Sequence, residues 1–211
     1  QLAGSILVTG SKPYTFSGSG NLTSTGTLTK ASSTNLTIGA QTNMLNGTFL
    51  NGGNTIINNG GNIAGGAIRF TGGSTLTDNT GTNYFTLSPN IEVNSGAVGN
   101  IVLSQRAELD GSLSGGGTFN IHCPSPIGDP WGRVNLDGAS AGCTGIVNLL
   151  GNGNGAIAFR ALGGSFNGFP SARVHLSGVD LFTQNYSGGN TYSFGELSGD
   201  ALSEIRGALN N

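Results

Sequence analysis

Charged side chains are scarce in this chain of 211 residues. They make up 9% of it, against about 25% in an average globular protein. The formal net charge is −2, and lysine occurs only at Lys12 and Lys30. A protein that binds nucleic acid through its phosphates needs a basic patch or stripe. The sequence has none, and we therefore expect no nucleic-acid partner.

Long apolar runs are missing as well. A membrane-spanning helix needs about 20 apolar residues in succession, whereas the run Ile6–Val8 ends at once in Thr9 and Gly10. We therefore expect no membrane span. The chain starts at Gln1 without a signal peptide, and such a start is what a signal peptidase can leave on a mature chain. This favours a secreted protein, extracellular or on the cell surface.

Helical periodicity is nearly absent too. Only residues 199–209 could form a helix, and a strand-like conformation explains that stretch about as well. Elsewhere the pattern is one of short β segments separated by glycine or asparagine. These segments are Asn35–Ile38, Asn54–Ile57, Ala67–Phe70, Tyr84–Leu87, Asn90–Val93, Asn100–Leu103, Arg133–Leu136 and Arg173–Leu176.

The segments are too short and too evenly spaced for a β-sandwich. Three of them make a coil of about 20 residues, which is the length of a solenoid repeat. Glycine, with 39 residues, and asparagine suit the corners of such coils because both tolerate a left-handed backbone. The sequence predicts one all-β domain over residues 1–211. We expect a right-handed parallel β-helix of roughly ten coils with a possible short terminal cap.

Three stretches of the sequence resemble a known repeat. Residues 18–30, Gly-Ser-Gly-Asn-Leu-Thr-Ser-Thr-Gly-Thr-Leu-Thr-Lys, with residues 35–39 after them, resemble the passenger-associated strand repeat of autotransporter-type bacterial surface proteins. Residues 109–119 and 192–199 are similar to the same phrase in degenerate form. The resemblance covers about a quarter of the chain and implies a secreted parallel β-helix. It carries no catalytic residues.

The two cysteines, Cys123 and Cys143, are separated along the chain by close to one expected coil of about 20 residues. Neighbouring coils lie about 4.8 Å from each other, and a disulfide accommodates that spacing of Cα atoms. We therefore expect a Cys123–Cys143 bond between neighbouring coils, which agrees with an oxidising compartment. The alternative is a pair of buried thiols.

Two places could carry carbohydrate chemistry. Strand alternation puts Arg106, Glu108 and Asp110 on one outer face, where carboxylates beside a basic group could serve a lyase or hydrolase; the alternative is a solvated exterior with a charge pair. The second place is a loop expected around residues 122–133, which holds half of the prolines and the only tryptophan. There Trp131 could stack on a sugar ring while Asp129 and Arg133 bind its hydroxyls, or Trp131 could simply pack on the solenoid.

Other motifs are weaker. Arg173 and His175 would point outward from one strand, and Arg133 and Arg173 could fall on one side of the rod, but a single histidine is more often structural. The two histidines and two cysteines have no zinc-binding spacing, so we expect no metal and no cofactor.

The leading functional hypothesis is a non-enzymatic extracellular structural or adhesive protein, such as a surface passenger, a matrix component or a fibre subunit. The alternative is a carbohydrate-binding module or a β-helix polysaccharide lyase. Solenoid ends expose strand edges that can pair with another copy. Residues 1–9 carry no charge, whereas the C-terminal segment has Asp200, Glu204 and Arg206. We expect head-to-tail association through residues 1–9, or else their folding back as a cap; the C-terminal end should be the better capped one.

Overall fold

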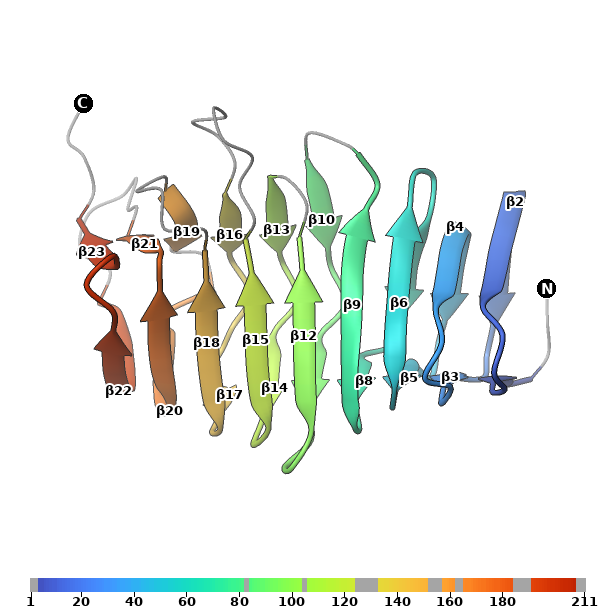
Figure 1. Cartoon of the computed structure of the whole chain (residues 1–211), viewed down its shortest axis with the longest axis horizontal. Coiled ribbons are helices and arrows are strands. Elements are labelled where there is room, and N and C mark those ends of the chain that lie inside the picture. Colours follow the sequence, from blue (N-terminus) through green and yellow to red (C-terminus); the bar gives the residue numbers. More distant parts are fainter. Residues whose placement is uncertain are drawn as a thin grey trace.

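The chain winds into a parallel β-solenoid of about eight turns in the computed structural model (Figure 1). The structure describes residues 4–81, 84–103, 106–123, 133–151, 157–161, 165–183 and 191–207. Within these ranges all regular elements are strands, and the predicted all-β solenoid is confirmed. Residues 204–206 form a strand, so the helical alternative for the C-terminal segment is wrong there.

The strands of successive coils pair in parallel and form three sheets. The seven-stranded sheet contains β1 (Ile6–Val8), β3 (Leu28–Lys30), β5 (Thr48–Leu50), β8 (Ile68–Phe70), β11 (Ile91–Val93), β14 (Leu113–Gly115) and β17 (Gly142–Cys143). The six-stranded sheet contains β10 (Phe85–Leu87), β13 (Ala107–Leu109), β16 (Val134–Leu136), β19 (Ile157–Ala161), β21 (Asp180–Thr183) and β23 (Glu204–Arg206). The ten-stranded sheet contains β2 (Tyr14–Ser24), β4 (Leu36–Met44), β6 (Gly53–Asn58), β7 (Asn62–Gly65), β9 (Gly73–Asn79), β12 (Val98–Val102), β15 (Thr118–His122), β18 (Ile146–Leu150), β20 (Gly168–Ser177) and β22 (Ser193–Gly199).

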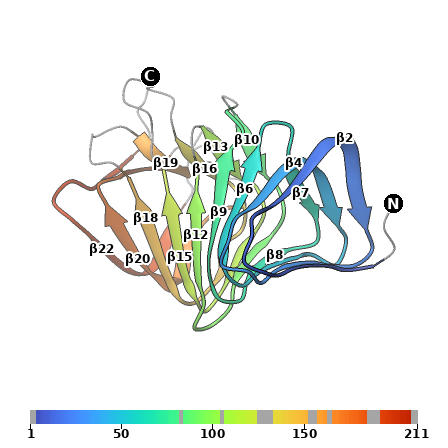
Figure 2. The same cartoon turned by 45° about the vertical axis from the view of Figure 1, so that its right-hand side comes forward.

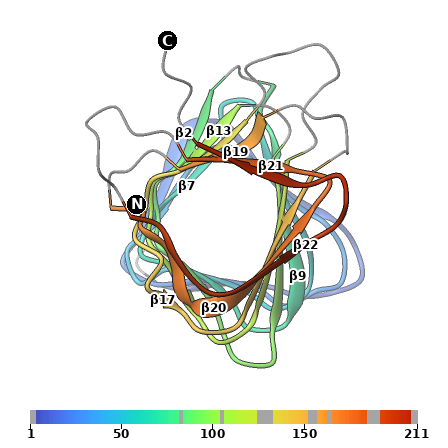
Figure 3. The ribbon, with the colours of Figure 1, turned by 90° about the vertical axis from the view of Figure 1, so that its left-hand side faces the viewer.

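The coils are not of equal length, which explains why there are fewer of them than predicted. Leu28 pairs with Thr48 across a short coil, whereas Thr118 pairs with Ile146 across a clearly longer one. The longer coils still superpose when the molecule is viewed along its long axis (Figure 3). Additional residues therefore enter the connections between strands and leave the stacked strands in register.

Alternation along each short strand builds the core. In β13 the inward-facing Ala107 and Leu109 are at most 1% exposed, while Glu108 between them is half-buried on the outside. Stacking then places inward residues of successive coils on one another, as with Leu50, Phe70 and Val93. Removing an aliphatic or aromatic side chain of this size from water contributes about 1.5–3 kcal/mol. The core is therefore a continuous apolar column along the rod.

A lysine side chain also belongs to this column. Lys30 follows Leu28 on the inward face of β3, stacks between Val8 and Leu50, and is fully buried. Its Nζ donates hydrogen bonds to the carbonyl oxygen of Ser32 and, at 2.9 Å, to that of Gly52. Burial lowers the pKa of the Lys30 ammonium because it disfavours the charged form.

Asn46 and Asn59 lie in turns between strands, but no described asparagine takes the left-handed conformation that the sequence suggested for the corners. Every described residue with a positive φ is a glycine. Several asparagines stack on the outer face of the ten-stranded sheet instead, where the Nδ2 of Asn120 donates to the Oδ1 of Asn100 at 2.8 Å and that of Asn148 to Asn120 at 2.7 Å. These side chains satisfy one another from coil to coil and so help to hold the register.

The predicted disulfide is absent: Cys123 and Cys143 are both buried thiols. The coil that contains them is longer than the uniform repeat expected from the sequence, so the two do not stack. Cys143 pairs with Gly115 in the seven-stranded sheet, whereas the amide of Cys123 donates to Leu150 beside the ten-stranded sheet. Burial raises the pKa of the Cys143 thiol to about 12, which keeps it protonated and unreactive.

Candidate functional site

The structure brings together two regions that the sequence treated as separate candidates. Strands β13 and β16 are neighbours in the six-stranded sheet, with Ala107 opposite Val134 and Glu108 opposite Asn135. The amide of Ala107 donates to the carbonyl of Arg133 at 3.0 Å. Figures 1 and 2 show β10, β13, β16 and β19 side by side along one flank of the rod. The outer face of β13 and β16 is therefore a single surface, called the β13–β16 face below.

The outward positions of β13 carry the charges that alternation predicted. Arg106 and Glu108 are half-buried and Asp110 is exposed. The guanidinium of Arg106 lies over the ring of Tyr84, 4.9 Å from its centroid, and the Tyr84 hydroxyl donates a hydrogen bond to the Glu108 carboxylate. The phenol ring thus holds both charged side chains in place from the preceding coil.

Burial and neighbouring charges both act on the protonation of Glu108. Burial raises the pKa of its carboxyl, and the nearby charges of Asp137 and Asp110 raise it further. Both causes act in the same direction, because desolvation and like charge each disfavour the ionised form. Glu108 can therefore serve as a hydrogen-bond donor over a wider pH range than an ordinary glutamate.

Next to Glu108, the same outward row becomes buried. The row continues through Asn135, Arg160 and Phe182, which are 2%, 5% and 7% exposed. The Oδ1 atom of Asn135 is buried and has no hydrogen-bond partner in the described part of the chain, and the same holds for the Nε atom of Arg106. A buried polar atom left without a partner typically costs about 1–3 kcal/mol. The β13–β16 face thus holds an acceptor and a donor that the described residues leave unused.

The loop expected around residues 122–133 is only partly described. Trp131 and Asp129 lie outside the described residues, so the sugar contact predicted for them stays a prediction. Arg133 is described and is 7% exposed at the start of β16. Among the described residues, no three His, Cys, Asp or Glu side chains gather closely enough to hold a metal ion.

Arg173 and His175 lie elsewhere, on the outer face of the ten-stranded sheet. Arg133 precedes a strand of the six-stranded sheet, so the expectation that Arg133 and Arg173 share one side of the rod is wrong. His175 has a partner that the sequence did not reveal: its Nδ1 lies 3.0 Å from the Ser198 Oγ. The two residues line a surface pocket of about 160 Å³ with Arg173 and Glu196.

The two ends of the solenoid differ in their exposed side chains. In the last described coil, Leu197 and Ile205 pair in register with Val174 and Leu181 and face inward with them. They are nevertheless 40% and 43% exposed, because no described strand lies against the outer edges of β22 and β23. Leu202, in the turn between these strands, is 65% exposed. Inward-facing apolar side chains are therefore open to solvent at this end.

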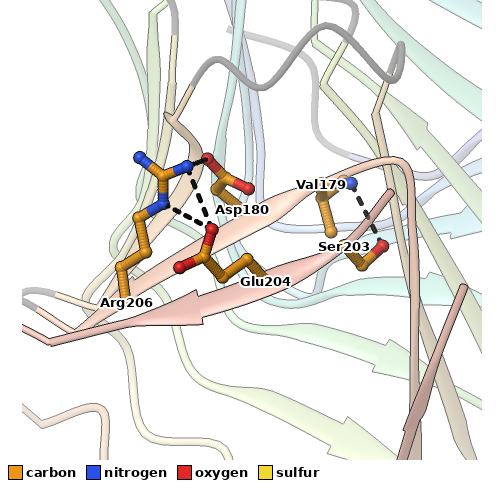
Figure 4. A network of polar contacts seen from close by, with 5 residues as sticks. All are labelled: Val179, Asp180, Ser203, Glu204 and Arg206. Carbon is orange, nitrogen blue, oxygen red and sulfur yellow. Dashed lines mark hydrogen bonds and ion pairs between the residues drawn. The ribbon is translucent and has the colours of Figure 1, made fainter. Parts of the chain in front are cut away.

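The charged residues of the last coil fasten it to the preceding coil and do not cover these side chains. Arg206 pairs with Glu204 at 3.0 Å and with the buried Asp180 at 3.2 Å, and the amide of Val179 donates to the Ser203 hydroxyl at 3.3 Å (Figure 4). We expected Asp200, Glu204 and Arg206 to make this the better-capped end. This expectation is wrong, because they leave the inward-facing apolar side chains of the last coil exposed.

At the other end, residues 6–8 form β1, which pairs with β3 of the same chain. Within the described part of residues 1–9, the fold-back alternative is thus what the structure shows. Lys12 is exposed in the loop that follows β1, and the free edge of the first coil is formed by β1 and β2.

Asp200 gives the last coil a measurable acid sensitivity. Its carboxylate accepts hydrogen bonds from the Ser203 and Ser177 hydroxyls and from the Gly178 and Leu202 amides. The Ser203 contact and the others lower its pKa from 3.8 to about 2. The stabilisation is therefore present above pH 3.8 and is lost as the pH falls through about 2.

We expect Asp200→Asn to be less stable than the intact protein at pH 5 and to approach it in stability at pH 2, in denaturant titrations at each pH. An equal difference at both values would contradict this.

No family model, curated protein or solved structure matches the chain. The parallel β-solenoid is compatible with the resemblance to autotransporter passengers, and that family assignment stays a proposal. The described residues contain no helix long and apolar enough to cross a membrane.

Proposed function

We propose that the protein is a structural β-solenoid, extracellular or on the cell surface, whose copies stack end to end. The observation that carries this proposal is the last described coil, where Leu197 and Ile205 face inward and yet are 40% and 43% exposed. A further coil placed on this end would bury both side chains in the same way as the internal coils bury theirs. It would also pair the open edges of β22 and β23.

The charges of the two ends favour a head-to-tail arrangement. In residues 4–24 the only charged side chain is that of Lys12, which gives the first coil a charge of +1. The last coil, residues 191–207, carries Glu196, Asp200 and Glu204 against Arg206, a charge of −2. Opposite charges steer the two different ends together, whereas two copies of the last coil repel each other.

The mode of association differs from the donated strand that the sequence suggested. Because β1 already pairs with β3 of its own chain, the first coil can offer only its outer edge. Stacking would thus join β1 and β2 of one copy to the last coil of the next copy. The extracellular location is supported by the resemblance of residues 18–39 to the passenger-associated repeat.

Sedimentation velocity over a rising protein concentration tests the proposal. The intact protein should form elongated multimers at low salt, and fewer at high salt because the end charges are screened. The double variant Leu202→Lys, Ile205→Lys should raise the dissociation constant at least tenfold, since it places two charges on the exposed apolar end.

The control is Leu45→Lys, because Leu45 is 54% exposed in the turn between β4 and β5, in the second coil and therefore outside the free edge of the first. This variant should associate like the intact protein. Lys12→Glu distinguishes the orientation, as it should weaken head-to-tail contacts and leave contacts between two last coils unaffected. An intact protein that stays monomeric at millimolar concentration, or multimers that survive the double variant, would refute the proposal.

A further inference from the structure

The outer face of the ten-stranded sheet is the most regular surface of the described chain. Its middle part is formed by the outward positions of five neighbouring strands, β6, β9, β12, β15 and β18, and is called the β6–β18 face below. These strands lie side by side along the rod (Figure 1). The face belongs to a flank of the solenoid, so a partner bound there does not depend on the stacking of the ends.

A row of polar side chains runs along the centre of the β6–β18 face. The register repeats from coil to coil without a shift, and each strand contributes one residue to the row: Asn54, Thr75, Asn100, Asn120 and Asn148. All five are partly exposed and therefore open to a partner. Neighbouring coils lie about 4.8 Å apart, and successive outward residues of one strand lie about 6.6 Å apart. The face is thus a two-dimensional array of side chains with two fixed repeats.

Rows that are rich in methyl groups lie on both sides of this polar row. The row on one side consists of Ile56, Thr77, Val102, His122 and Leu150. The row on the other side begins in β12 and consists of Val98, Thr118 and Ile146. Burial lowers the pKa of the His122 imidazole, which favours its neutral form. Hydrogen-bonding groups and methyl groups therefore alternate across the face.

Charged side chains are missing from this face. The structure describes all five strands in full, and none of their outward positions carries an acid, a lysine or an arginine. The other two sheets differ, since Arg69 and Glu92 form an ion pair on one of them and Glu108 lies outward on the other. A charged partner thus finds no opposite charge here. The only ring at these positions is the imidazole of His122, so a polysaccharide would lack the aromatic surface that commonly lines binding sites.

The side chains of the face are held in fixed positions. The Nδ2 of Asn120 donates to Asn100 at 2.8 Å, and that of Asn148 donates to Asn120 at 2.7 Å. The Thr77 hydroxyl donates to the Oδ1 of Asn54 at 3.0 Å. Valine, isoleucine and threonine are stiff at χ1, and groups that are already ordered lose little entropy on binding. A side-chain amide has two N–H donors and its oxygen two lone pairs, so these asparagines can still bind water on their outer side.

We propose that the β6–β18 face binds the surface of ice crystals. A repeating array is matched best by a partner that repeats at the same intervals, because weak contacts made by one rigid body add up. On a prism face of hexagonal ice, water oxygens repeat at intervals close to the distance between coils and to the distance between rows. The amides and hydroxyls can take the place of lattice waters as donors and acceptors, and the methyl groups between them order the water around them. Ice is also uncharged and needs no aromatic surface.

Nanolitre osmometry and an ice-recrystallisation assay test the inference. The intact protein should hold the freezing point of a small ice crystal below its melting point, and it should keep small crystals in a frozen sucrose solution from merging into large ones. Thr77→Lys and Thr118→Lys each place a long charged side chain in one of the two outer rows of the face. Each variant should lose both effects, because the lysine keeps the ice surface away from the array.

The matched control is Thr86→Lys. Thr86 is also a partly exposed, outward-facing residue of a strand, β10, but it lies on the six-stranded sheet, so this variant should keep both effects. Circular dichroism establishes that each variant is folded at the temperature of the assays. The inference is overturned if the intact protein leaves the freezing and melting points equal, if both folded variants of the β6–β18 face act on ice like the intact protein, or if the protein binds microcrystalline cellulose or chitin and has no effect on ice.

Discussion

Between neutral pH and 10.5, the free energy of unfolding of the intact protein should rise relative to that of the Lys30→Met variant. The Cys143 thiol, whose raised pKa acts in the opposite direction above pH 9, is present in both proteins and cancels in this comparison. Lys30 is fully buried, and its pKa is lowered from 10.5 by burial. Between the folded and unfolded pKa values the unfolded chain binds more protons, so stability increases with pH. Each unit that separates the two pKa values adds about 1.4 kcal/mol to the rise.

Denaturant titrations from pH 7 to pH 10.5 measure this effect. The control is Lys12→Met, because Lys12 is exposed and is the only other lysine; this variant should follow the pH dependence of the intact protein. Far-ultraviolet circular dichroism at each pH establishes that the folded baseline is the same. A rise of equal size in the Lys30→Met variant would show that Lys30 is not its source.

Lys30 also shows what strand alternation can predict from the sequence and what it cannot. In Leu28, Thr29 and Lys30 the first and last residues share a face, and the burial of Leu28 implies the burial of Lys30. Its charge nevertheless argues for the surface, because lysine is rarely fully buried. What the sequence could not supply was the pair of carbonyl acceptors from Ser32 and Gly52, since the second of these belongs to the next coil.

The fold itself was predictable because its signal is local. Each of the short apolar segments found in the sequence lies within or overlaps a strand of the structure, for example Ala67–Phe70 around β8 and Asn90–Val93 around β11. The lengths of the connections between strands cannot be predicted from local sequence, because they depend on which residues of successive coils pair with each other. The predicted disulfide failed for this reason: a uniform coil of about 20 residues would have stacked Cys123 and Cys143, and the actual coil is longer.

The candidate site was predictable in its parts and not in its assembly. Strand alternation correctly placed Arg106, Glu108 and Asp110 outward. Their position beside Arg133 and Asn135 follows from a register that joins Ala107 to Val134, two residues far apart in the sequence. Asn135 itself was overlooked, although its position between Val134 and Leu136 marks it as outward-facing. Its burial could not be foreseen, because alternation alone predicts an exposed position on the outer face.

The second large effect is expected from the glycines that lie where coils touch most closely. Gly99 is buried beside Phe70, and a Cβ atom added to it would lie 2.8 Å from the Phe70 Cγ and 2.9 Å from the Val93 Cγ2. Gly99→Ala should therefore destabilise the protein by about 1–3 kcal/mol through overpacking. Because the obstacles are side chains, Phe70→Ala should relieve the closer one, since it removes the Phe70 Cγ. The double variant should be more stable than the sum of the two single effects predicts, by about 0.5 kcal/mol or more.

Gly138 differs because its obstacle is the backbone. A Cβ atom there would lie 2.0 Å from the carbonyl oxygen of Gly111 in the preceding coil. This oxygen belongs to the backbone, so no substitution of a neighbouring side chain can remove the clash. Gly138→Ala should therefore force the two coils apart and cost about 4 kcal/mol or more, at the upper end of single substitutions. Phe70→Ala should not rescue this variant, and the two effects should add to within about 0.5 kcal/mol. Thermal and urea unfolding of the single and double variants measure both cycles. If Gly138→Ala proves milder than Gly99→Ala, the close backbone stacking at this corner does not limit the approach of the coils.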